Sequence, residues 1–182
     1  MSAPPDAQLT HVGLYVDDMD AMVAFYTGLI GFVVTDRGRF GDRDLAFLSR
    51  RAHEHHQLVL VTGRRAGADV QLLSQLSFRV EGLDALRYFH HRALELGASA
   101  MEGRDHGNSW SVYFEDPEGN RVEVYTATPW YVRQPWRAPL DLSASNDAIE
   151  ATTRARIEEG ATWQPVATWR AELAARLSRG ER

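Results

Sequence analysis

The chain has 182 residues, a formal net charge of −5 and a hydrophobic fraction of 44%, which is typical of one globular domain or two small halves with a buried core. It contains no Cys and, among its 20 basic residues, no Lys, which excludes disulfides, thiolate metal sites, cysteine nucleophiles and lysine Schiff bases. The acidic balance argues against nucleic acid, and the lack of a membrane-length apolar run or a signal-peptide pattern predicts a cytoplasmic protein that binds small molecules or proteins, not membranes.

The first half of the chain is predicted to form a strand, a helix and three further strands. The expected elements are a strand at 10–16, a helix at 19–30 and strands at 32–35, 45–48 and 57–62. Asp18 is placed to cap the N-terminus of the helix, and Gly31 is placed to end it.

The second half repeats this order of elements. Its expected elements are a strand at 75–80, a helix at 84–96 and strands at 98–102, 109–115 and 121–126. An offset of 64 residues (75 − 11) aligns His11 with Gln75 and, later in each half, Val59 with Glu123. The repeat therefore predicts two similar modules, each a strand, a helix and three strands, related by a pseudo-twofold axis.

The composition changes after residue 128. The remaining segment holds four of the five Trp residues and two helical patterns, near 146–159 and 165–177, so it is too apolar to be a free disordered tail. We expect it to pack over the core or across a subunit interface. The predicted organisation is a mobile N-terminus at 1–8, a first module at 9–62, a linker at 63–73, a second module at 74–128 and a C-terminal extension at 129–182.

Two short motifs open and close the repeated region. The first is His-Val-Gly-Leu-Tyr-Val-Asp-Asp-Met-Asp, from His11, and the second is Phe-Glu-Asp-Pro-Glu-Gly-Asn-Arg-Val-Glu, which ends at Glu123. With the two modules, they resemble the vicinal oxygen chelate superfamily, which contains glyoxalase I, bleomycin resistance proteins and type I extradiol dioxygenases. The resemblance covers about residues 9–128. It implies an α+β fold in which two βαβββ modules form a cup-shaped mixed sheet, with the partly helical extension outside it.

The resemblance also implies a divalent metal where the first and last strands of both modules converge. The corresponding positions are His11, Val59, Gln75 and Glu123. Val59 has no donor atom, whereas glyoxalase relatives usually present a carboxylate there, so the pattern favours the extradiol branch with three metal ligands, His11, Gln75 and Glu123. Extradiol enzymes present His at the position of Gln75. Gln75 therefore either coordinates through its amide oxygen or hydrogen-bonds to a ligand.

A third motif also favours the extradiol branch, because it follows the order and spacing of the family's C-terminal extradiol motif. Its residues are His106, Val112-Tyr113, Asp116-Pro117, Gly119 and Glu123. The resemblance implies that Tyr113 and His106 stabilise developing charge on substrate oxygen.

The family's acid–base histidine corresponds to His56, just before the strand that closes the first module. Simple strand alternation would instead place His55 on the same face as Val59. A bulge or twist at the start of the strand would turn His56 toward the site. We expect His56 in this role, with His55 as the alternative.

Together these features imply a metal-dependent extradiol dioxygenase that cleaves a catechol-like aromatic. The implied substrates are a small aromatic diol and O2, the implied metal is Fe(II) with Mn(II), Ni(II) or Zn(II) as further candidates, and the implied assembly is a homodimer or higher homo-oligomer. Two alternatives stay open: a glyoxalase-like isomerase or lyase acting on a bidentate oxygen substrate, and a non-enzymatic protein that binds an aromatic compound or antibiotic. Val59 weighs against the isomerase, and the pair His11 and Glu123 weighs against the binding protein.

Overall fold

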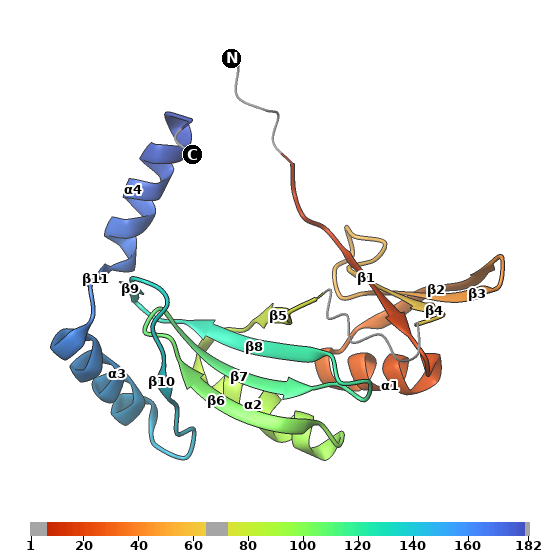
Figure 1. Cartoon of the computed structure of the whole chain (residues 1–182), viewed down its shortest axis with the longest axis horizontal. Coiled ribbons are helices and arrows are strands. Elements are labelled where there is room, and N and C mark those ends of the chain that lie inside the picture. The colour runs from red at the N-terminus through yellow and green to blue at the C-terminus, as the bar shows by residue number, and fades with distance from the viewer. Residues whose placement is uncertain (1–6, 65–72, 181–182) are drawn as a thin grey trace.

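Two sheets, each with a helix packed against one face, make up most of the protein, and a C-terminal segment lies beside the second sheet (Figure 1). The computed structural model describes residues 7–64 and 73–180. Most of the N-terminus predicted to be mobile (1–8) and of the predicted linker (63–73) lies outside the described residues.

The first unit is a four-stranded sheet with one helix. Its elements are β1 (Val12–Val16), α1 (Met19–Ile30), β2 (Val33–Phe40), β3 (Arg43–Ser49) and β4 (Leu58–Thr62). The strand order is β1-β4-β3-β2, in which β1 and β4 run parallel and the other neighbours run antiparallel. The sheet is therefore mixed, with the first and last strands of the unit side by side.

The second unit repeats this arrangement. Its elements are β5 (Leu76–Arg79), α2 (Gly82–Glu95), β6 (Ser99–Asp105), β7 (Ser109–Glu115) and β8 (Arg121–Ala127). The strand order is β10-β6-β7-β8-β5, with β5 and β8 parallel and one added strand, β10, from the C-terminal segment. The first and last strands of the unit again lie side by side.

The pairing register of these parallel strands is the same in both units. Gly13 pairs with Val59 in the first unit, and Ser77 pairs with Glu123 in the second. Both members of the first pair are displaced by the 64-residue offset found in the sequence (77 − 13 and 123 − 59). This identity of register confirms the predicted α+β fold built from two βαβββ modules.

The helix α1 forms where the sequence predicts it. The side chain of Asp18 accepts a hydrogen bond from the backbone N–H of Ala21 at 2.9 Å, and Gly31 ends the helix with a φ of 74°, a conformation that suits glycine. The strand β2 is longer than expected, because residues 35–40 are polar or exposed and show no alternation of buried side chains. Residues 35–40 form part of the strand because they pair with β3.

Strand alternation sends one set of side chains to the helices and the other to the opposite, open face. In β1, Leu14 and Val16 are buried on the side of α1, whereas Tyr15 between them is 54% exposed. In β8, Val122 and Val124 belong to the buried core. Glu123 lies between them and therefore points to the open face of the second sheet.

The turn between β7 and β8 joins the two modules. Asp116 in this turn accepts a hydrogen bond from the Tyr26 hydroxyl of α1 at 2.9 Å, in a buried position. Glu118 accepts hydrogen bonds from the backbone N–H groups of Asp17 and Asp18 at 2.7 and 2.8 Å, just before α1. Arg64 forms an ion pair with Glu118 at 3.1 Å. One turn of the second module thus holds the start and the middle of the helix of the first.

The C-terminal extension packs on the second module through its first helix. Its elements are β9 (Trp130–Val132), β10 (Ala138–Pro139), α3 (Asn146–Gly160), β11 (Trp163–Pro165) and α4 (Val166–Ser178). The helix α3 buries Ile149, Thr153 and Ile157, whereas α4 has no buried residue and stands away from the sheets (Figure 1). The extension therefore has a part built into the core and a part that projects from it.

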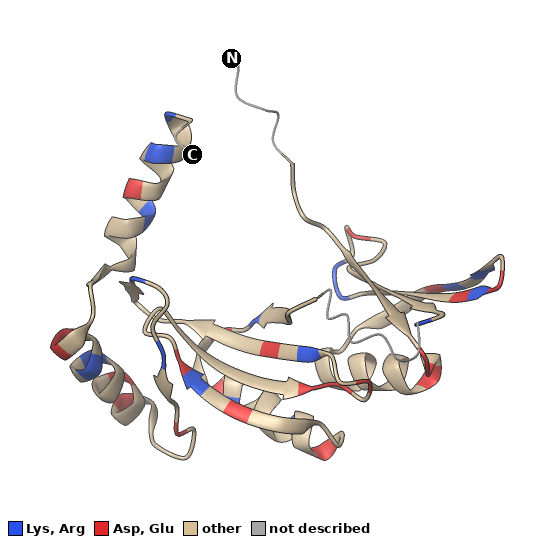
Figure 2. Cartoon of the chain, viewed as in Figure 1, with Lys and Arg blue, Asp and Glu red and all other residues tan. Residues whose placement is uncertain are grey.

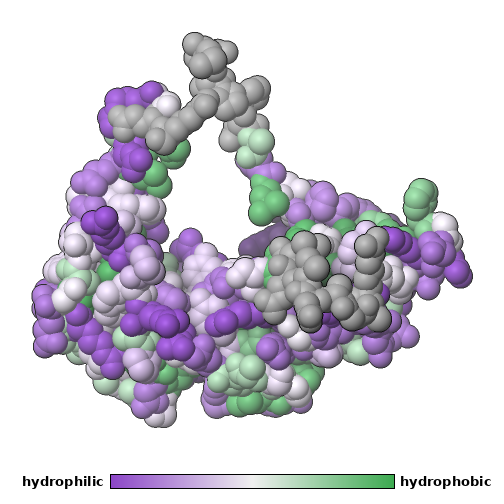
Figure 3. Space-filling view, viewed as in Figure 1, coloured by the Kyte–Doolittle hydropathy of each residue, from purple (hydrophilic) through white to green (hydrophobic). Residues whose placement is uncertain are grey.

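None of the helices within residues 7–64 and 73–180 is long and apolar enough to cross a bilayer. Figure 3 shows hydrophobic surface in separate small areas, one of them at the tip of the hairpin between β2 and β3, where Phe40 is 82% exposed.

The turn that joins the modules generates a stability prediction. Tyr26→Phe removes the hydroxyl that donates to Asp116, and burial together with the charge of Asp116 raises the pKa of Tyr26, so this donor stays protonated. We expect the free energy of unfolding, measured by urea denaturation, to fall by about 1–2 kcal/mol. Tyr88→Phe, at a 60% exposed position of α2, is the matched control and should change it by less than about 0.5 kcal/mol. Equal losses in the two variants would contradict the role of this bond.

Candidate functional site

The carboxylate of Glu123 is the centre of a hydrogen-bonded group on the open face of the second sheet. It accepts hydrogen bonds from the Tyr113 hydroxyl at 2.6 Å, from the Gln75 amide at 2.8 Å and from the Ser77 hydroxyl at 2.6 Å. Sheet register causes this convergence, because Ser77 on β5 and Tyr113 on β7 both pair directly with Glu123 on β8. Gln75 stands two residues before Ser77 and shares its face.

The bond to Glu123 fixes the orientation of the Gln75 amide. An ionised carboxylate can only accept, so the NH2 group of Gln75 must face it, and the same NH2 group also donates to Ser77 at 2.9 Å. The amide oxygen of Gln75 then points away from Glu123 and accepts no hydrogen bond from the described residues. This oxygen is the atom through which Gln75 could bind a metal.

Glu123 is only 7% exposed, and the groups that donate hydrogen bonds to its carboxylate carry no charge. Two basic residues nearby on this face, which appear as blue bands on β6 and β8 in Figure 2, are engaged elsewhere. Arg104 and Arg121 both contact Glu102, and the Arg121 guanidinium also lies 4.4 Å from the centre of the Tyr113 ring. No Arg or His forms an ion pair with Glu123 in the described part of the chain.

This environment fits a bound divalent cation. A buried carboxylate is normally paired with a positive charge or coordinates a metal, and amide and imidazole donors complete a hard or borderline ligand set. Within the described residues there is no cluster of three or more His, Asp or Glu side chains that could hold a metal. The predicted ligand set contains only two residues of those types, His11 and Glu123, and the amide of Gln75 would be its third member.

His106 extends the Glu123 group toward the C-terminal extension. Its Nε2 lies 3.1 Å from the Tyr113 hydroxyl oxygen, and its Nδ1 lies 3.2 Å from the backbone carbonyl oxygen of Trp136. Burial raises the pKa of Tyr113 to about 12, with the hydrogen bond and the charge of Glu123 adding to the effect. The Tyr113 hydroxyl therefore stays protonated across the neutral pH range: it donates its one hydrogen to Glu123, and its oxygen faces Nε2 of His106.

A second group of candidate residues lies near the start of β1 and β4. The rings of His11 and His56 meet edge to face with centroids 4.5 Å apart. His55 bonds to Asp36 through Nε2 at 2.8 Å and to Nδ1 of His56 through its own Nδ1 at 2.9 Å. Partial burial lowers the pKa of His56 below its ordinary value of 6.5, and the nearby His11 and His55 lower it further. His56 is therefore a neutral imidazole at neutral pH.

The conflict between His55 and His56 is explained by where the strand begins. β4 starts at Leu58, so the alternation that would place His55 on the face of Val59 does not extend to either histidine. His56 lies against His11, and His55 points to Asp36 of β2. The assignment of the acid–base role to His56 stays a prediction, but its geometry needs no bulge.

The predicted site residues thus fall into two groups. One contains Gln75, Glu123, Tyr113 and His106, and the other contains His11 and His56. No hydrogen bond or ring contact between described residues joins the two groups, so the ligand set His11, Gln75 and Glu123 stays a prediction.

Three groups that lie in or beside the candidate site were not predicted from the sequence. Strand alternation and the repeat register together could have identified Ser77, because both place it opposite Glu123. The carbonyl group of Trp136 gives no signal in the sequence. Ser111, fully buried on the same face of β7 as Tyr113, lies close enough to Tyr113 for its hydroxyl to lower the pKa of that residue by hydrogen bonding.

Comparisons with known proteins agree with this fold. A family model described as Glyoxalase/Bleomycin resistance protein/Dioxygenase superfamily matches residues 8–124, more than half of the chain. The chain is 29% identical over 137 residues to a metapyrocatechase from Geobacillus stearothermophilus, a match that covers 71% of this chain and 37% of that protein. The chain thus spans little more than a third of the length of this curated relative.

Two solved structures show the same architecture. A glyoxylase/bleomycin resistance protein/dioxygenase domain from Frankia sp. EAN1pec superposes with a TM-score of 0.60 at 24% identity and covers 68% of this chain and 100% of that one. A fosfomycin resistance protein from Listeria monocytogenes, solved with Mn(II) and 1S,2S-dihydroxypropylphosphonic acid, has a TM-score of 0.55 at 17% identity and covers 68% and 93%. At these identities the similarity shows the fold alone.

The Glu123 group generates a prediction about the Tyr113 hydroxyl. Glu123→Gln removes a negative charge that helps to hold the Tyr113 pKa at about 12, so this pKa should fall toward the ordinary value of 10. Titration of the metal-free protein with ¹³C-labelled tyrosine, followed by NMR, reports it directly. Glu115→Gln is the control, because Glu115 lies on the same strand and bonds to Ser99 instead. An unchanged Tyr113 pKa in Glu123→Gln would show that the carboxylate does not accept this hydrogen bond.

Proposed function

Because the chain belongs to the glyoxalase/bleomycin resistance/dioxygenase superfamily, we propose that it is a metal-dependent extradiol dioxygenase acting on a catechol-like diol. The observation that carries this proposal is the bonded series Glu123, Tyr113 and His106, in which a buried carboxylate without a basic partner meets two groups able to stabilise oxygen charge. The similarity to a metapyrocatechase over part of that protein supports the dioxygenase branch.

The ligands that we propose for the metal are His11, Gln75 and Glu123. An imidazole, an amide oxygen and a carboxylate suit Fe(II), with Mn(II), Ni(II) and Zn(II) as further candidates. The chemistry that bound Fe(II) supplies is Lewis-acid stabilisation of the deprotonated diol and electron transfer to O2. The amide oxygen of Gln75 is a weaker donor than imidazole, so its contribution to affinity is the smallest of the three.

The remaining residues handle protons and oxygen charge. His56 is neutral because its pKa is lowered, so its ring can take a proton from a substrate hydroxyl and return it later in the reaction. The Tyr113 hydroxyl keeps its proton, which it gives to Glu123 in this structure, and by turning this hydrogen from Glu123 it could donate to a substrate oxygen that gains charge. His106 bonds to the same hydroxyl and supports this donation.

Oxygen uptake tests the proposal directly. The protein is loaded anaerobically with Fe(II), its metal content is measured, and O2 consumption and absorbance are followed with a panel of catechols. We expect one O2 consumed per diol cleaved, with a coloured ring-opened product. Bound metal without O2 consumption would favour the isomerase or lyase alternative. Failure to bind metal would favour a protein that only binds an aromatic compound or antibiotic.

The role of His56 has a separate test. His56→Phe should leave the metal content unchanged and lower kcat by about 100-fold or more, because it removes the acid–base group. His53→Phe, at an exposed position of the same loop, is the matched control and should keep full activity. His55→Phe tests the alternative assignment. A larger loss in His55→Phe than in His56→Phe would transfer the role to His55.

A further inference from the structure

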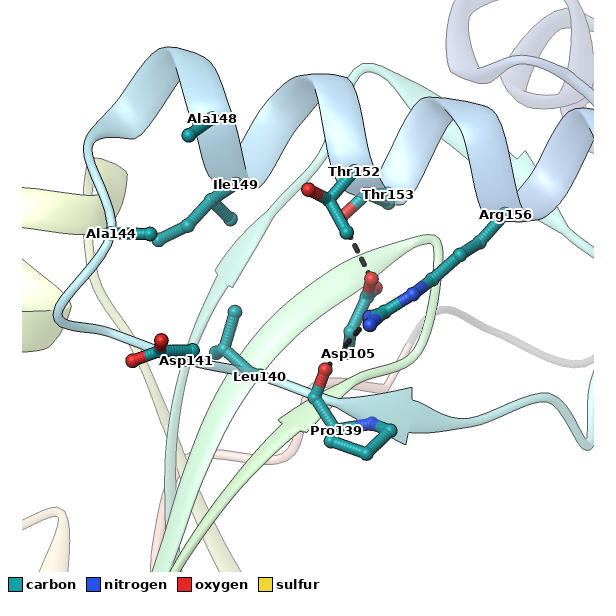
Figure 4. A pocket seen from close by; sticks show the side chains of 10 residues that line it. All are labelled: Asp105, Pro139, Leu140, Asp141, Ala144, Ala148, Ile149, Thr152, Thr153 and Arg156. Carbon is teal, nitrogen blue, oxygen red and sulfur yellow. Dashed lines mark hydrogen bonds between the residues drawn. The ribbon is translucent and has the colours of Figure 1, made fainter.

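A cavity lies between the helix α3 and the edge of the second sheet, where β6 pairs with β10. Its volume is about 180 Å³, and Figure 4 shows α3 on one side of it and the chain between β10 and α3 on the other. The family model ends at residue 124, before both β10 and α3. The cavity is therefore built largely by the part of the chain that the family similarity does not cover.

One end of the cavity is apolar. Figure 4 shows that its lining there comes from the segment after β10 and from the start of α3, with the side chains of Leu140, Ala144, Ala148 and Ile149. Ile149 is only 4% exposed. An engineered protein cavity of about 150 Å³ with aliphatic and aromatic walls binds benzene. The size and the walls of this cavity therefore suit one six-membered hydrocarbon ring.

The other end is polar and contains the carboxylate of Asp105, a residue that is 1% exposed. One oxygen of this carboxylate accepts a hydrogen bond from the Thr153 hydroxyl at 2.7 Å, and the other accepts from the Gly107 N–H at 2.8 Å. The Thr153 oxygen accepts from the Trp110 indole N–H at 2.8 Å, so its single hydrogen goes to Asp105. Each carboxylate oxygen can accept two hydrogen bonds, so Asp105 still has acceptor capacity for a ligand.

Arg156 of α3 lines the same end of the cavity. Its Nη1 donates to the Pro139 carbonyl at 2.8 Å, which uses one of the five N–H bonds of the guanidinium. Burial raises the pKa of Asp105, whereas its hydrogen bonds and the nearby charge of Arg156 lower it. The charge of Arg156 thus acts on Asp105, although no ion pair directly joins these two described residues. A small polar group between them could contact both.

The two charges at this end select a neutral hydroxyl. A hydroxyl has one hydrogen to donate to the Asp105 carboxylate, and its oxygen can accept from an Arg156 N–H, so every hydrogen has one acceptor. A ligand carboxylate would meet the negative charge of Asp105, and a ligand ammonium would meet the positive charge of Arg156. Asp141 also lines the cavity, but it is exposed and already accepts from the hydroxyl and the N–H of Ser143.

The cavity is separate from the candidate metal site. Asp105 pairs with Trp110 across β6 and β7, and Trp110 faces α3 through its bond to Thr153. Tyr113, three residues further along β7, lies on the opposite face of the sheet, because successive side chains of a strand alternate. A ligand in the cavity is thus on the other side of the sheet from Glu123, which pairs with Tyr113.

We propose that this cavity is a binding site for a neutral monocyclic phenol. The ring lies against Leu140 and Ile149, and the hydroxyl lies between the Asp105 carboxylate and the Arg156 guanidinium. Because Asp105 also holds the Gly107 N–H, an occupied cavity sits beside the loop that carries His106. The proposal does not depend on the proposed dioxygenase function, since it concerns the other face of the sheet and needs no metal.

Methyl NMR of the full-length metal-free protein tests the proposal, because the chain has only three Ile residues, Ile30, Ile149 and Ile157. The probe is phenol, and Ile149→Val identifies the Ile149 signal by its loss. We expect phenol to shift the Ile149 Cδ1 methyl signal saturably, with a Kd of about 1 mM or lower, while the signal of Ile30 in α1 stays unchanged. An Ile149 signal that does not shift, or that shifts no more than that of Ile30, would overturn the proposal.

Three related probes test the ligand class. Toluene has the shape of phenol without the hydroxyl, benzoate carries a negative charge and benzylammonium carries a positive charge. Each should bind at least about tenfold more weakly than phenol, because each leaves Asp105 or Arg156 without a suitable partner. Toluene bound as tightly as phenol would refute the role of the polar end. Tighter binding of either ion would refute the neutral ligand class.

Variants of α3 locate the site. Ala148→Leu fills the apolar end and should weaken phenol binding at least about tenfold, whereas Ala151→Leu, at an exposed position outside the cavity, should change it by less than about twofold. Arg156→Met removes the N–H donors, so phenol should lose its preference over toluene. Arg154→Met is the matched control, because Arg154 bonds to Glu158 instead. Unchanged binding in Ala148→Leu, or a phenol preference that survives in Arg156→Met, would contradict the placement of the ligand.

Tyr113→Phe separates this cavity from the candidate metal site. It removes the hydroxyl beside Glu123 and should leave the effect of phenol on the Ile149 signal unchanged. Loss of that effect would place the phenol in the Glu123 group and overturn the proposal. If the protein cleaves no catechol, the proposed function fails, and the wild-type methyl spectrum still decides whether the cavity binds phenol. The same spectrum decides it where a variant fails to fold.

Discussion

A carboxylate buried in a sheet must be satisfied by groups that the neighbouring strands bring to it, and Glu123 imposes this requirement on the open face of the second module. Its partners come from both adjacent strands and are all neutral, so the charge is stabilised by hydrogen bonds and is left available to a cation. The Tyr113 hydroxyl also contacts His106, and the ring of His106 in turn contacts a backbone carbonyl of the extension. Most of the candidate site is a consequence of this one buried charge.

The two modules share a backbone and differ in chemistry at the matching positions. Where the second module has Ser77 opposite Glu123, the first has Gly13 opposite Val59. No hydrogen-bonded group of this kind can form around Val59, and the first module instead contributes the imidazoles of His11 and His56. The repeat thus supplies the scaffold twice, while each copy carries a different set of candidate site residues.

The parts of the structure that the sequence predicts best are those set by periodic burial. The helix α1, its cap and its terminal glycine, and the strand β7 occur at the predicted positions, because helical spacing and local hydrogen bonds define them. β2 was predicted too short because its polar, exposed end is held only by pairing with β3. The strands β9, β10 and β11 were not predicted, since short strands depend on distant partners more than on their own residues.

The sequence by itself determined the repeat, its register and the side chains present at each matching position, because these follow from spacing along one chain. The tertiary structure decided which histidine lies beside His11, that Ser77 joins Gln75 at Glu123, and that a carbonyl of the extension meets the ring of His106. Those outcomes involve loops and contacts between residues far apart in sequence, for which no periodic pattern exists. Directional hydrogen bonds between such residues form only once the packed elements have set the distances.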